Sequence, residues 1–209
     1  PLDIIEEMNR QFDDAIITTD VGQHMMLVSQ YAEITEKKQL VMSGGLGTMG
    51  YGFPAAIGAQ IGNPEKRVIA VSGDGGMQMN IQEFATAVLE ETPVIACVFN
   101  NTYLGMVRQW QKLFYGKRYG MTNLRAGALS RRTDGAEFPE YTPDFVKLAE
   151  SYGAKGIRVT KTEEISAAFE EAKKNTKTPT LIEFIIDPEE MVYPMIKPGG
   201  TLEDMIMDC

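Results

Sequence analysis

Short apolar runs alternate with helix-like segments along most of this chain, and this alternation is the feature that most restricts its fold. The strand-like runs, rich in Ile and Val, are 15–20, 39–43, 67–74, 93–101, 156–160 and 179–187. Helical spacing or composition predicts helices at 2–12, 53–62, 81–90, 102–114, 142–153 and 161–175. Buried strands that alternate with helices form parallel sheets covered on both faces. We therefore predict an α/β fold of three layers, with a mostly parallel sheet and helices on both faces.

Two segments interrupt this alternation and set the predicted domain boundaries. Residues 115–141 are too long for an ordinary connection, so this loop is either functional or disordered. The segment 188–209 contains three prolines and is predicted to be a C-terminal arm. Residues 1–187 then form one domain. Because the chain opens in a helix pattern without an initiator Met, we expect a piece of a longer protein, although tag removal would leave the same start.

Charge and cysteine content exclude several classes of function. The net charge of −9 disfavours nucleic acid and anionic membrane as partners. No apolar run is long enough to cross a bilayer. Cys97 and Cys209 show no spacing typical of a metal site or a disulfide framework, which favours a reducing, cytoplasmic location. A small anionic ligand stays possible if backbone amides and a cation bind it.

The stretch SGDGGMQMN, residues 72–80, places Asp74 at the end of a strand and among glycines. In open α/β sheets, ligands bind at this end of the strands. Exposed amides next to a helix start suit a phosphate, and we expect Asn80 to cap that helix with Glu83 as its partner. A carboxylate would repel phosphate unless a divalent cation lay between them. The motif by itself fits a simple turn equally well. Its glycines are Gly73, Gly75 and Gly76.

The next strand-like run ends in Asn100 and Asn101, and 24 residues separate Gly75 from Asn100. One helix and one strand fill such an interval, so the two strand ends are expected to be neighbours. An Asn side-chain oxygen is a neutral ligand for a hard cation, and a backbone carbonyl just after it would supply a third oxygen. Asp74 and the Asn pair are thus predicted to share one ion.

This order, GDG, a 24-residue interval and NN, resembles the cofactor motif of thiamine diphosphate enzymes. The resemblance implies that Asp74, the Asn101 side chain and the Tyr103 carbonyl bind Mg²⁺. Diphosphate oxygens and a water molecule would complete the octahedron.

Longer stretches resemble the C-terminal cofactor domain of acetohydroxyacid synthase, also called acetolactate synthase. They are TDVGQHMM, SGGLGTMGYGFPAAIGAQ, GMVRQWQ, LFYGKRY and VYPMIKPGG, within 2–205. Pyruvate oxidase and glyoxylate carboligase share the cofactor motif, but GMVRQWQ followed by LFY favours the catalytic subunit of the synthase.

The resemblance implies a carboligation in branched-chain amino acid biosynthesis. Pyruvate would be decarboxylated on thiamine diphosphate, and the two-carbon unit would join a second 2-keto acid, pyruvate or 2-ketobutyrate. The family's activating Glu lies on the N-terminal domain of a neighbouring subunit, so no catalytic residue is assigned here. The resemblance further implies a homo-oligomer, a possible regulatory subunit, and FAD on a central domain. Nothing in these residues resembles the N-terminal or central domain.

Residue roles follow from the same resemblance. The expected cofactor-contacting residues are Gly22, Gln23, His24, Gly47, Met49, Gly73, Asp74, Gly75, Gly76, Asn101, Tyr103, Gly105, Met106 and Val107. The first three would contact the diphosphate, and Met49 would support the bent cofactor. Met106 and Trp110 would line the substrate pocket, where Trp110 would contact the extra methylene of 2-ketobutyrate.

Simpler interpretations stay open for these positions. His24, the only histidine, would otherwise be a surface residue at a helix start. Met49 would fill core space, because an unbranched Met adapts to irregular gaps. Met106, Val107 and Trp110 would form one core-facing stripe of a helix.

The basic residues near the loop receive no firm role. Arg108 is expected to be a surface charge, and Arg118 to face solvent or lie in a mobile lid. Residues 120–143 form a segment longer than the family loop, and its arginines would meet an acidic surface or belong to a solvated insertion. They are Arg125, Arg131 and Arg132.

Two other functions stay open for the chain as a whole. One is a stand-alone module that sequesters thiamine diphosphate. The other is a nucleotide-binding protein with a fortuitous motif.

Overall fold

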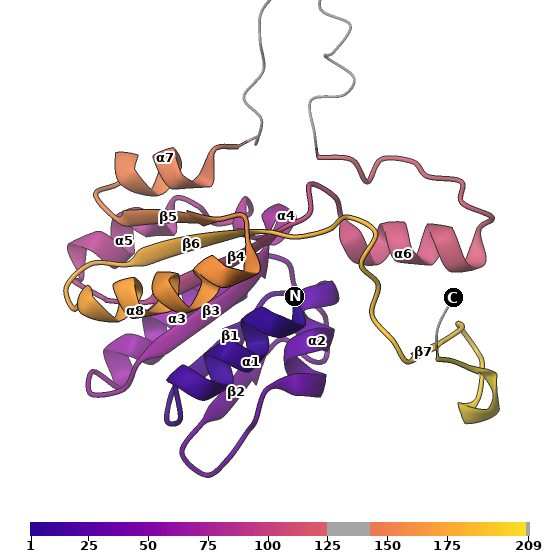
Figure 1. Ribbon diagram of the computed structural model, residues 1–209, viewed down its shortest axis with the longest axis horizontal. Helices are drawn as coiled ribbons and strands as arrows, with labels where there is room; N and C mark the ends of the chain where they lie inside the picture. The colour runs from indigo at the N-terminus through magenta and orange to yellow at the C-terminus, as the bar shows by residue number, and fades with distance from the viewer. Residues whose placement is uncertain (125–142, 208–209) are drawn as a thin grey trace, which may run out of the picture.

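The computed structural model describes residues 1–124 and 143–207, and its centre is a parallel sheet of six strands (Figure 1). The strands are β1 (Ile16–Thr19), β2 (Gln39–Met42), β3 (Val68–Gly73), β4 (Ile95–Asn100), β5 (Lys155–Val159) and β6 (Thr180–Ile185). Their order across the sheet is β2-β1-β3-β4-β6-β5. Each strand coincides with one of the apolar runs, and the predicted α/β fold is confirmed. The expectations for Arg125, Arg131 and Arg132 concern residues outside the described ranges, and so does residue 142, the first of the predicted helix 142–153.

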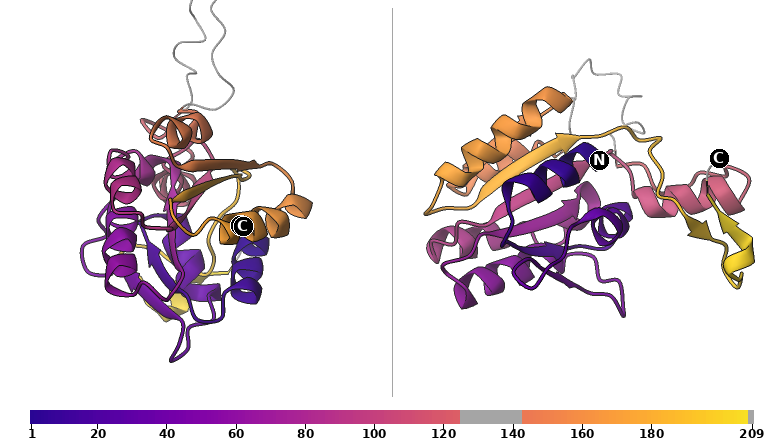
Figure 2. Two further views of the ribbon diagram at one scale, coloured as in Figure 1. Left: turned by 90° about the vertical axis from the view of Figure 1, so that its left-hand side faces the viewer. Right: turned by 60° about the horizontal axis from the view of Figure 1, so that its bottom comes forward.

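Helices cover both faces of the sheet, which gives three layers (Figure 2). On one face lie α1 (Leu2–Gln11), α2 (Gln23–Tyr31) and α8 (Ile165–Lys174), which follows the short 3-10 helix η2 (Thr162–Glu164). On the other face lie α3 (Gly52–Gly62), α5 (Glu83–Leu89) and α7 (Phe145–Ser151). Alternate side chains of each strand enter the two hydrophobic clusters, as a period of two requires. Ile17 packs into the first cluster and Ile16 into the second.

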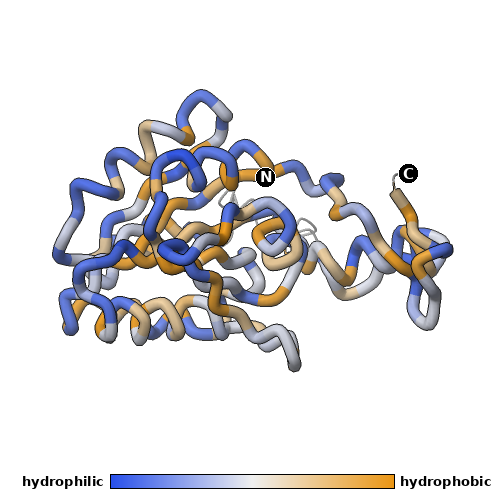
Figure 3. Tube along the Cα trace, turned by 90° about the horizontal axis from the view of Figure 1, so that it is seen from below, coloured by the Kyte–Doolittle hydropathy of each residue, from blue (hydrophilic) through white to orange (hydrophobic). Residues whose placement is uncertain are grey.

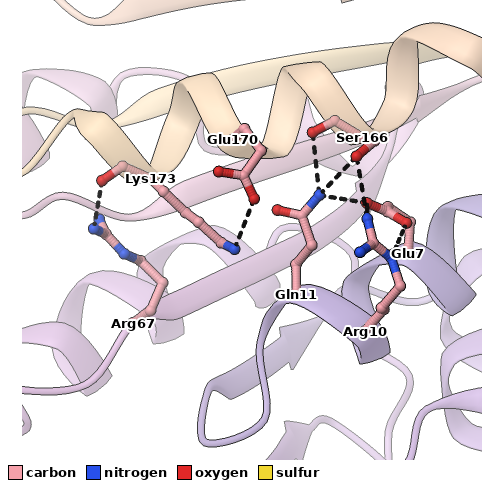
Figure 4. A network of polar contacts seen from close by, with 7 residues as sticks. All are labelled: Glu7, Arg10, Gln11, Arg67, Ser166, Glu170 and Lys173. Carbon is pink, nitrogen blue, oxygen red and sulfur yellow. Dashed lines mark hydrogen bonds and ion pairs between the residues drawn. The ribbon is translucent and has the colours of Figure 1, made fainter.

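Helices α1 and α8 lie side by side although they come from opposite ends of the chain. The rings of Phe12 and Phe169 meet edge to face, with 5.6 Å between centroids. Polar contacts run along the edge of this apolar seam (Figure 4). There the Gln11 side-chain amide donates to the Ser166 carbonyl at 3.1 Å, and Arg67 donates to the Lys173 carbonyl at 3.1 Å. The first and last helices of the sheet domain are thereby joined.

The register of the sheet brings three strand ends to one edge. Thr19 of β1 pairs with Val71 of β3, and Gly73 of β3 pairs with Phe99 of β4. The residues after these strand ends, Asp20, Asp74 and Asn101, therefore lie along the same carboxyl edge.

Helix α6 (Gly105–Phe114) projects beyond the sheet, next to the segment that contains β7 (Met195–Ile196) (Figures 1 and 2). β7 pairs with β8 (Met205–Ile206), and the short 3-10 helix η3 (Leu202–Asp204) lies between them. Hydrophobic segments gather along the sheet, and a separate hydrophobic stretch lies at this hairpin (Figure 3). Among the residues of α6, only Gln109 is buried, and Val107 is 50% exposed. The interpretation of α6 as a core-facing stripe is therefore wrong.

Two predicted helix starts are also wrong. Residues 74–77 form a short helix of their own, α4 (Asp74–Met77), and α5 begins only at Glu83. Asn80 does not cap α5 with its side chain: its oxygen accepts from the Gln82 side-chain amide at 3.2 Å, and its amide donates to the Gly50 carbonyl at 2.7 Å. Helix α7 begins at Phe145, and its cap is Asp144, whose carboxylate accepts from the Lys147 amide.

Within residues 1–124 and 143–207, no helix combines the length and the hydrophobicity needed to span a membrane.

Candidate cofactor site

One cavity lies at the carboxyl edge of the sheet, between the ends of β1, β3 and β4 and the start of α6. It gathers nearly all of the residues that the resemblance implied. These are Gly22, Gln23, His24, Met49, Gly73, Asp74, Gly75, Gly76, Asn101, Tyr103, Gly105, Met106 and Val107. Gly47 is not among the lining residues. It takes a left-handed φ of 59° in the turn that precedes Met49, so it determines the conformation of this loop and does not itself line the cavity.

Asp74 is buried at the start of α4, with 4% of its surface exposed. Its Oδ1 accepts from the Gly75 amide at 2.9 Å, whereas its Oδ2 is buried without a hydrogen-bond partner among the described residues. Burial raises the pKa of the carboxyl to about 7, although the Gly75 and Thr102 amides oppose this. A buried carboxylate oxygen that lacks a donor is suited to bind a cation.

Asn101 and Tyr103 form the opposite side of the cavity. The Asn101 side-chain oxygen Oδ1 accepts from the Tyr103 backbone amide at 3.0 Å, which closes a tight turn. Thr102, inside the turn, has a left-handed φ of 62°. Within the described residues, no three His, Cys, Asp or Glu side chains are grouped to hold a metal. A metal beside Asp74 would therefore depend on neutral oxygens, such as those of Asn101 and Tyr103, in addition to the Asp74 carboxylate.

His24 is buried in the first turn of α2, so the interpretation as a surface residue is wrong. Its ring packs against two glycines: a Cβ on Gly22 would lie 2.6 Å from the ring carbon Cε1, and one on Gly73 would lie 3.0 Å from it. Burial lowers the pKa of His24 to about 4, so the imidazole is neutral at pH 7. Its Nε2 has no hydrogen-bond partner among the described residues. A neutral, buried imidazole nitrogen is thus left to bind a ligand.

Asp20 organises this edge of the sheet, and the sequence argument did not single it out. Its carboxylate accepts from the Gly50 amide at 2.7 Å, from the Tyr51 amide at 3.2 Å and from the Ser72 hydroxyl at 2.8 Å. Burial raises the pKa of this carboxyl. A Cβ on Gly76 would lie 2.2 Å from Asp20 Oδ2, so a glycine is required there. The strand-end argument used for Asp74 applies equally to Asp20 and would have found it.

Gln109 connects α6 to the segment after β6. Its amide donates to the Val192 carbonyl at 2.8 Å, and its oxygen accepts from the Val192 amide at 3.0 Å. Gln23 donates to the same oxygen at 2.9 Å and accepts from Asn101 at 3.3 Å. A line of amide groups therefore joins Val192 to Asn101. The sequence did not predict this contact, because a polar residue such as Gln109 is ordinary in an amphipathic helix.

Arg108 is not the surface charge that the sequence suggested. Its guanidinium pairs with the Glu189 carboxylate and donates to the Pro188 carbonyl at 3.0 Å. It also lies 4.8 Å from the ring centroid of Tyr103 and 4.7 Å from that of Tyr119. These contacts hold α6 against the segment that follows β6, and the expected role of Arg108 is corrected accordingly.

A second cavity extends the first along α6. Met106 and Val107 line both cavities, and Trp110, Tyr115 and Arg118 line only the second. Trp110 packs edge to face against Phe114, with 5.5 Å between centroids. Arg118 is exposed, in agreement with the solvent-facing alternative.

Comparison with known proteins identifies the family. Residues 20–184 match the family described as thiamine pyrophosphate enzyme, C-terminal TPP binding domain. The chain belongs to this family of TPP-binding domains. The matched range includes Asp20, His24, Asp74 and Asn101, so most of the cavity wall belongs to the matched TPP-binding domain.

The TPP-binding domain is also similar to named relatives. It is 42% identical over 205 residues to the probable acetolactate synthase large subunit of Methanocaldococcus jannaschii, covering 98% of this chain and 32% of that protein. It is 42% identical over 206 residues to the acetolactate synthase large subunit of Corynebacterium glutamicum, covering 98% and 31%. It is 40% identical over 194 residues to the acetolactate synthase isozyme 3 large subunit of Escherichia coli, covering 92% and 31%. The chain spans about a third of the length of these relatives.

Proposed function

We propose that this chain is the diphosphate- and Mg²⁺-binding domain of a thiamine diphosphate-dependent acetolactate synthase. The observation that carries the proposal is the buried Oδ2 of Asp74, which has no donor among the described residues and lines the same cavity as Asn101. The domain family and the names of the relatives agree with it. No feature of the site favours a nucleotide-binding protein or a sequestering module.

The residues of the cavity divide by chemistry. Asp74, the Asn101 side chain and the Tyr103 carbonyl would hold Mg²⁺, because all three offer oxygen ligands. The start of α2, at Gly22 and Gln23, would bind the diphosphate. His24, whose imidazole is neutral at pH 7, would contact the diphosphate without adding charge. When bound, thiamine diphosphate supplies the electron sink for decarboxylation of a 2-keto acid.

The apolar part of the site would hold the reacting end of the cofactor and the substrates. Met49 lines the cavity beside Gly75, at whose position a Cβ would lie 3.5 Å from the Met49 methyl carbon. Pyruvate and 2-ketobutyrate would reach the cofactor along α6, past Met106 and Trp110. These apolar surroundings would exclude water from the reacting end of the bound cofactor.

The remaining parts of the proposal concern the whole protein. The product would enter branched-chain amino acid biosynthesis, that is, isoleucine, valine and leucine. The N-terminal domain of a neighbouring catalytic subunit would complete the site and supply the activating Glu. We further propose a cytoplasmic homo-oligomer that carries FAD on a central domain and pairs with a regulatory subunit. Residues 1–187 would be the TPP-binding domain and 188–209 its C-terminal arm.

The metal assignment is tested by Asp74→Ala in the full-length protein that contains this chain. Calorimetry with Mg²⁺ and thiamine diphosphate should show at least a hundredfold weaker binding, on the order expected for a lost charged ligand. Circular dichroism should show an unchanged fold. Unchanged affinity in the variant would contradict the assignment.

The substrate pocket is tested by Trp110→Leu in the same protein. Competition between pyruvate and 2-ketobutyrate should give a product ratio that changes by about tenfold, since one methylene contact is worth about 1–3 kcal/mol. Trp110 lines the second cavity, so its loss should not unfold the domain. A constant product ratio would remove Trp110 from acceptor recognition.

A further inference from the structure

Glu183 is a carboxylate in the middle of the most buried part of the sheet. It lies on β6, and none of its surface is exposed. The neighbouring residues of β6 are apolar, so a Val or Ile would continue the strand pattern at this position. A fully buried carboxylate strongly destabilises a fold unless it is paired and hydrogen-bonded. Its partners therefore indicate what it does.

The two oxygens of Glu183 have different partners. Oε2 accepts from Arg158 Nε at 2.7 Å, and Arg158 is the residue paired with Glu183 across β5 and β6. Arg158 in turn donates to Asp144, the cap of α7, at 2.6 Å. Oε1 accepts from the Asn100 side-chain amide at 2.7 Å. The contact with Arg158 balances the charge of Glu183, whereas the contact with Asn100 connects Glu183 to the end of β4, next to the cavity.

Asn100 transmits this contact to the turn at the end of β4. Its side-chain oxygen accepts from the Thr102 amide at 3.0 Å, which is possible only while the Asn100 amide group keeps its orientation. Glu183 fixes that orientation because a carboxylate accepts and cannot donate, so the NH₂ group of Asn100 must face it. Thr102 has a left-handed φ of 62°, a conformation that a β-branched residue rarely adopts without support. The flanking residues of this turn are Asn101 and Tyr103.

We propose that Glu183 is a positioning residue, which acts through Asn100 to hold the 101–103 turn in the shape that places the Asn101 side chain and the Tyr103 carbonyl at the metal. This inference rests on the proposed function, since it names what supports the proposed ligands. Glu183 touches neither substrate nor cofactor, so its influence is indirect.

The test uses the full-length protein and the variants Glu183→Gln, Asn100→Ala and their combination. In the metal-free protein, hydrogen exchange of the 101–103 amides should be about tenfold faster in each single variant, because a hydrogen bond to a charged group is lost or misdirected. The Mg²⁺ dissociation constant, measured by calorimetry with thiamine diphosphate, should rise by about the same factor. Glu171→Gln, which removes the exposed carboxylate that pairs with Lys155, is the matched control and should change neither quantity.

The double variant separates positioning from a general structural or electrostatic role. If Glu183 acts through Asn100, Glu183→Gln should have no further effect on Mg²⁺ binding in the Asn100→Ala background. The inference is overturned if Glu183→Gln weakens Mg²⁺ binding as much in the Asn100→Ala background as in the wild type. It is also overturned if hydrogen exchange of the 101–103 amides is unchanged in Glu183→Gln. Should Glu183→Gln fail to fold, Glu183→Asp keeps the charge, shortens the reach to Asn100 and takes its place. A wild-type protein that binds no Mg²⁺ would overturn the proposed function, while the exchange data would still decide whether Glu183 holds the turn.

Discussion

Asp74 is ionised at pH 8 in surroundings that disfavour its charge, because burial raises the pKa of its carboxyl to about 7. The folded, metal-free protein keeps a proton that the unfolded chain, with a pKa near 3.8, releases. The contribution of Asp74 to the free energy of unfolding is therefore lost as the pH rises from about 4 to about 7. His24 acts in the opposite direction, because its lowered pKa of about 4 makes stability rise between pH 4 and 6.5.

The residue-scale prediction follows from this difference. Asp74→Asn should stabilise the metal-free protein relative to wild type, and this advantage should be greater at pH 8 than at pH 5 by about 1–3 kcal/mol. Denaturant unfolding at both pH values, with a chelator present, would measure it. Asp14→Asn, at an exposed carboxylate, is the matched control. If Asp74→Asn stabilised the protein equally at both pH values, ionisation of Asp74 would not destabilise the metal-free fold.

At the scale of elements, α6 depends on one polar side chain for its attachment. Gln109 is the buried residue of this helix and makes two hydrogen bonds to Val192 and one to Gln23. Gln109→Ala should destabilise the contact by about 1–3 kcal/mol, because the buried backbone groups of Val192 lose their partners.

Hydrogen exchange of residues 188–196 in the full-length protein would measure the effect of Gln109→Ala. Gln111→Ala is the matched control on the same helix, since the Gln111 side chain forms its hydrogen bonds with Gly120 and not with residues 188–196 of the described chain. The control should leave exchange of 188–196 unchanged. If both variants speed exchange equally, Gln109 has no special role in holding this segment.

The sequence allowed the six strands of the parallel sheet to be predicted because each of them is a short apolar run, but it did not reveal the polar contacts between elements. Asp74 could be predicted as a site residue because glycines surround it at a strand end. Glu183 could not, because one acidic residue in an apolar strand gives no indication of its partners on β4 and β5. The cap at Asn80 was predicted wrongly because the side chain bonds to Gly50, a contact between segments thirty residues apart.

At the scale of the whole molecule, this domain should fold alone and yet catalyse little. Both hydrophobic clusters are built from its own residues. The cavity supplies groups for the metal and the diphosphate, whereas the proposed acid–base residue for the cofactor belongs to another domain.

Pyruvate turnover by the purified 209-residue chain, with excess Mg²⁺ and thiamine diphosphate, should therefore be at least a hundredfold below that of the full-length protein, the range expected for losing general acid–base catalysis. Circular dichroism of the same sample would check that it is folded. Full-length-like turnover would show that the proposed division of the active site is wrong.

The strand order β2-β1-β3-β4-β6-β5 also has a consequence for biosynthesis. The ribosome releases β4 and β5 before β6, yet in the finished sheet β6 lies between them. A nascent chain that has emerged only as far as β5 must keep open the place that β6 will fill. Until residues 180–185 leave the exit tunnel, Asn100 has no Glu183 to face. Translation proceeds at about 5–20 residues per second, so the 101–103 turn is outside the ribosome for several seconds before β6, the strand that supports it, has been synthesised.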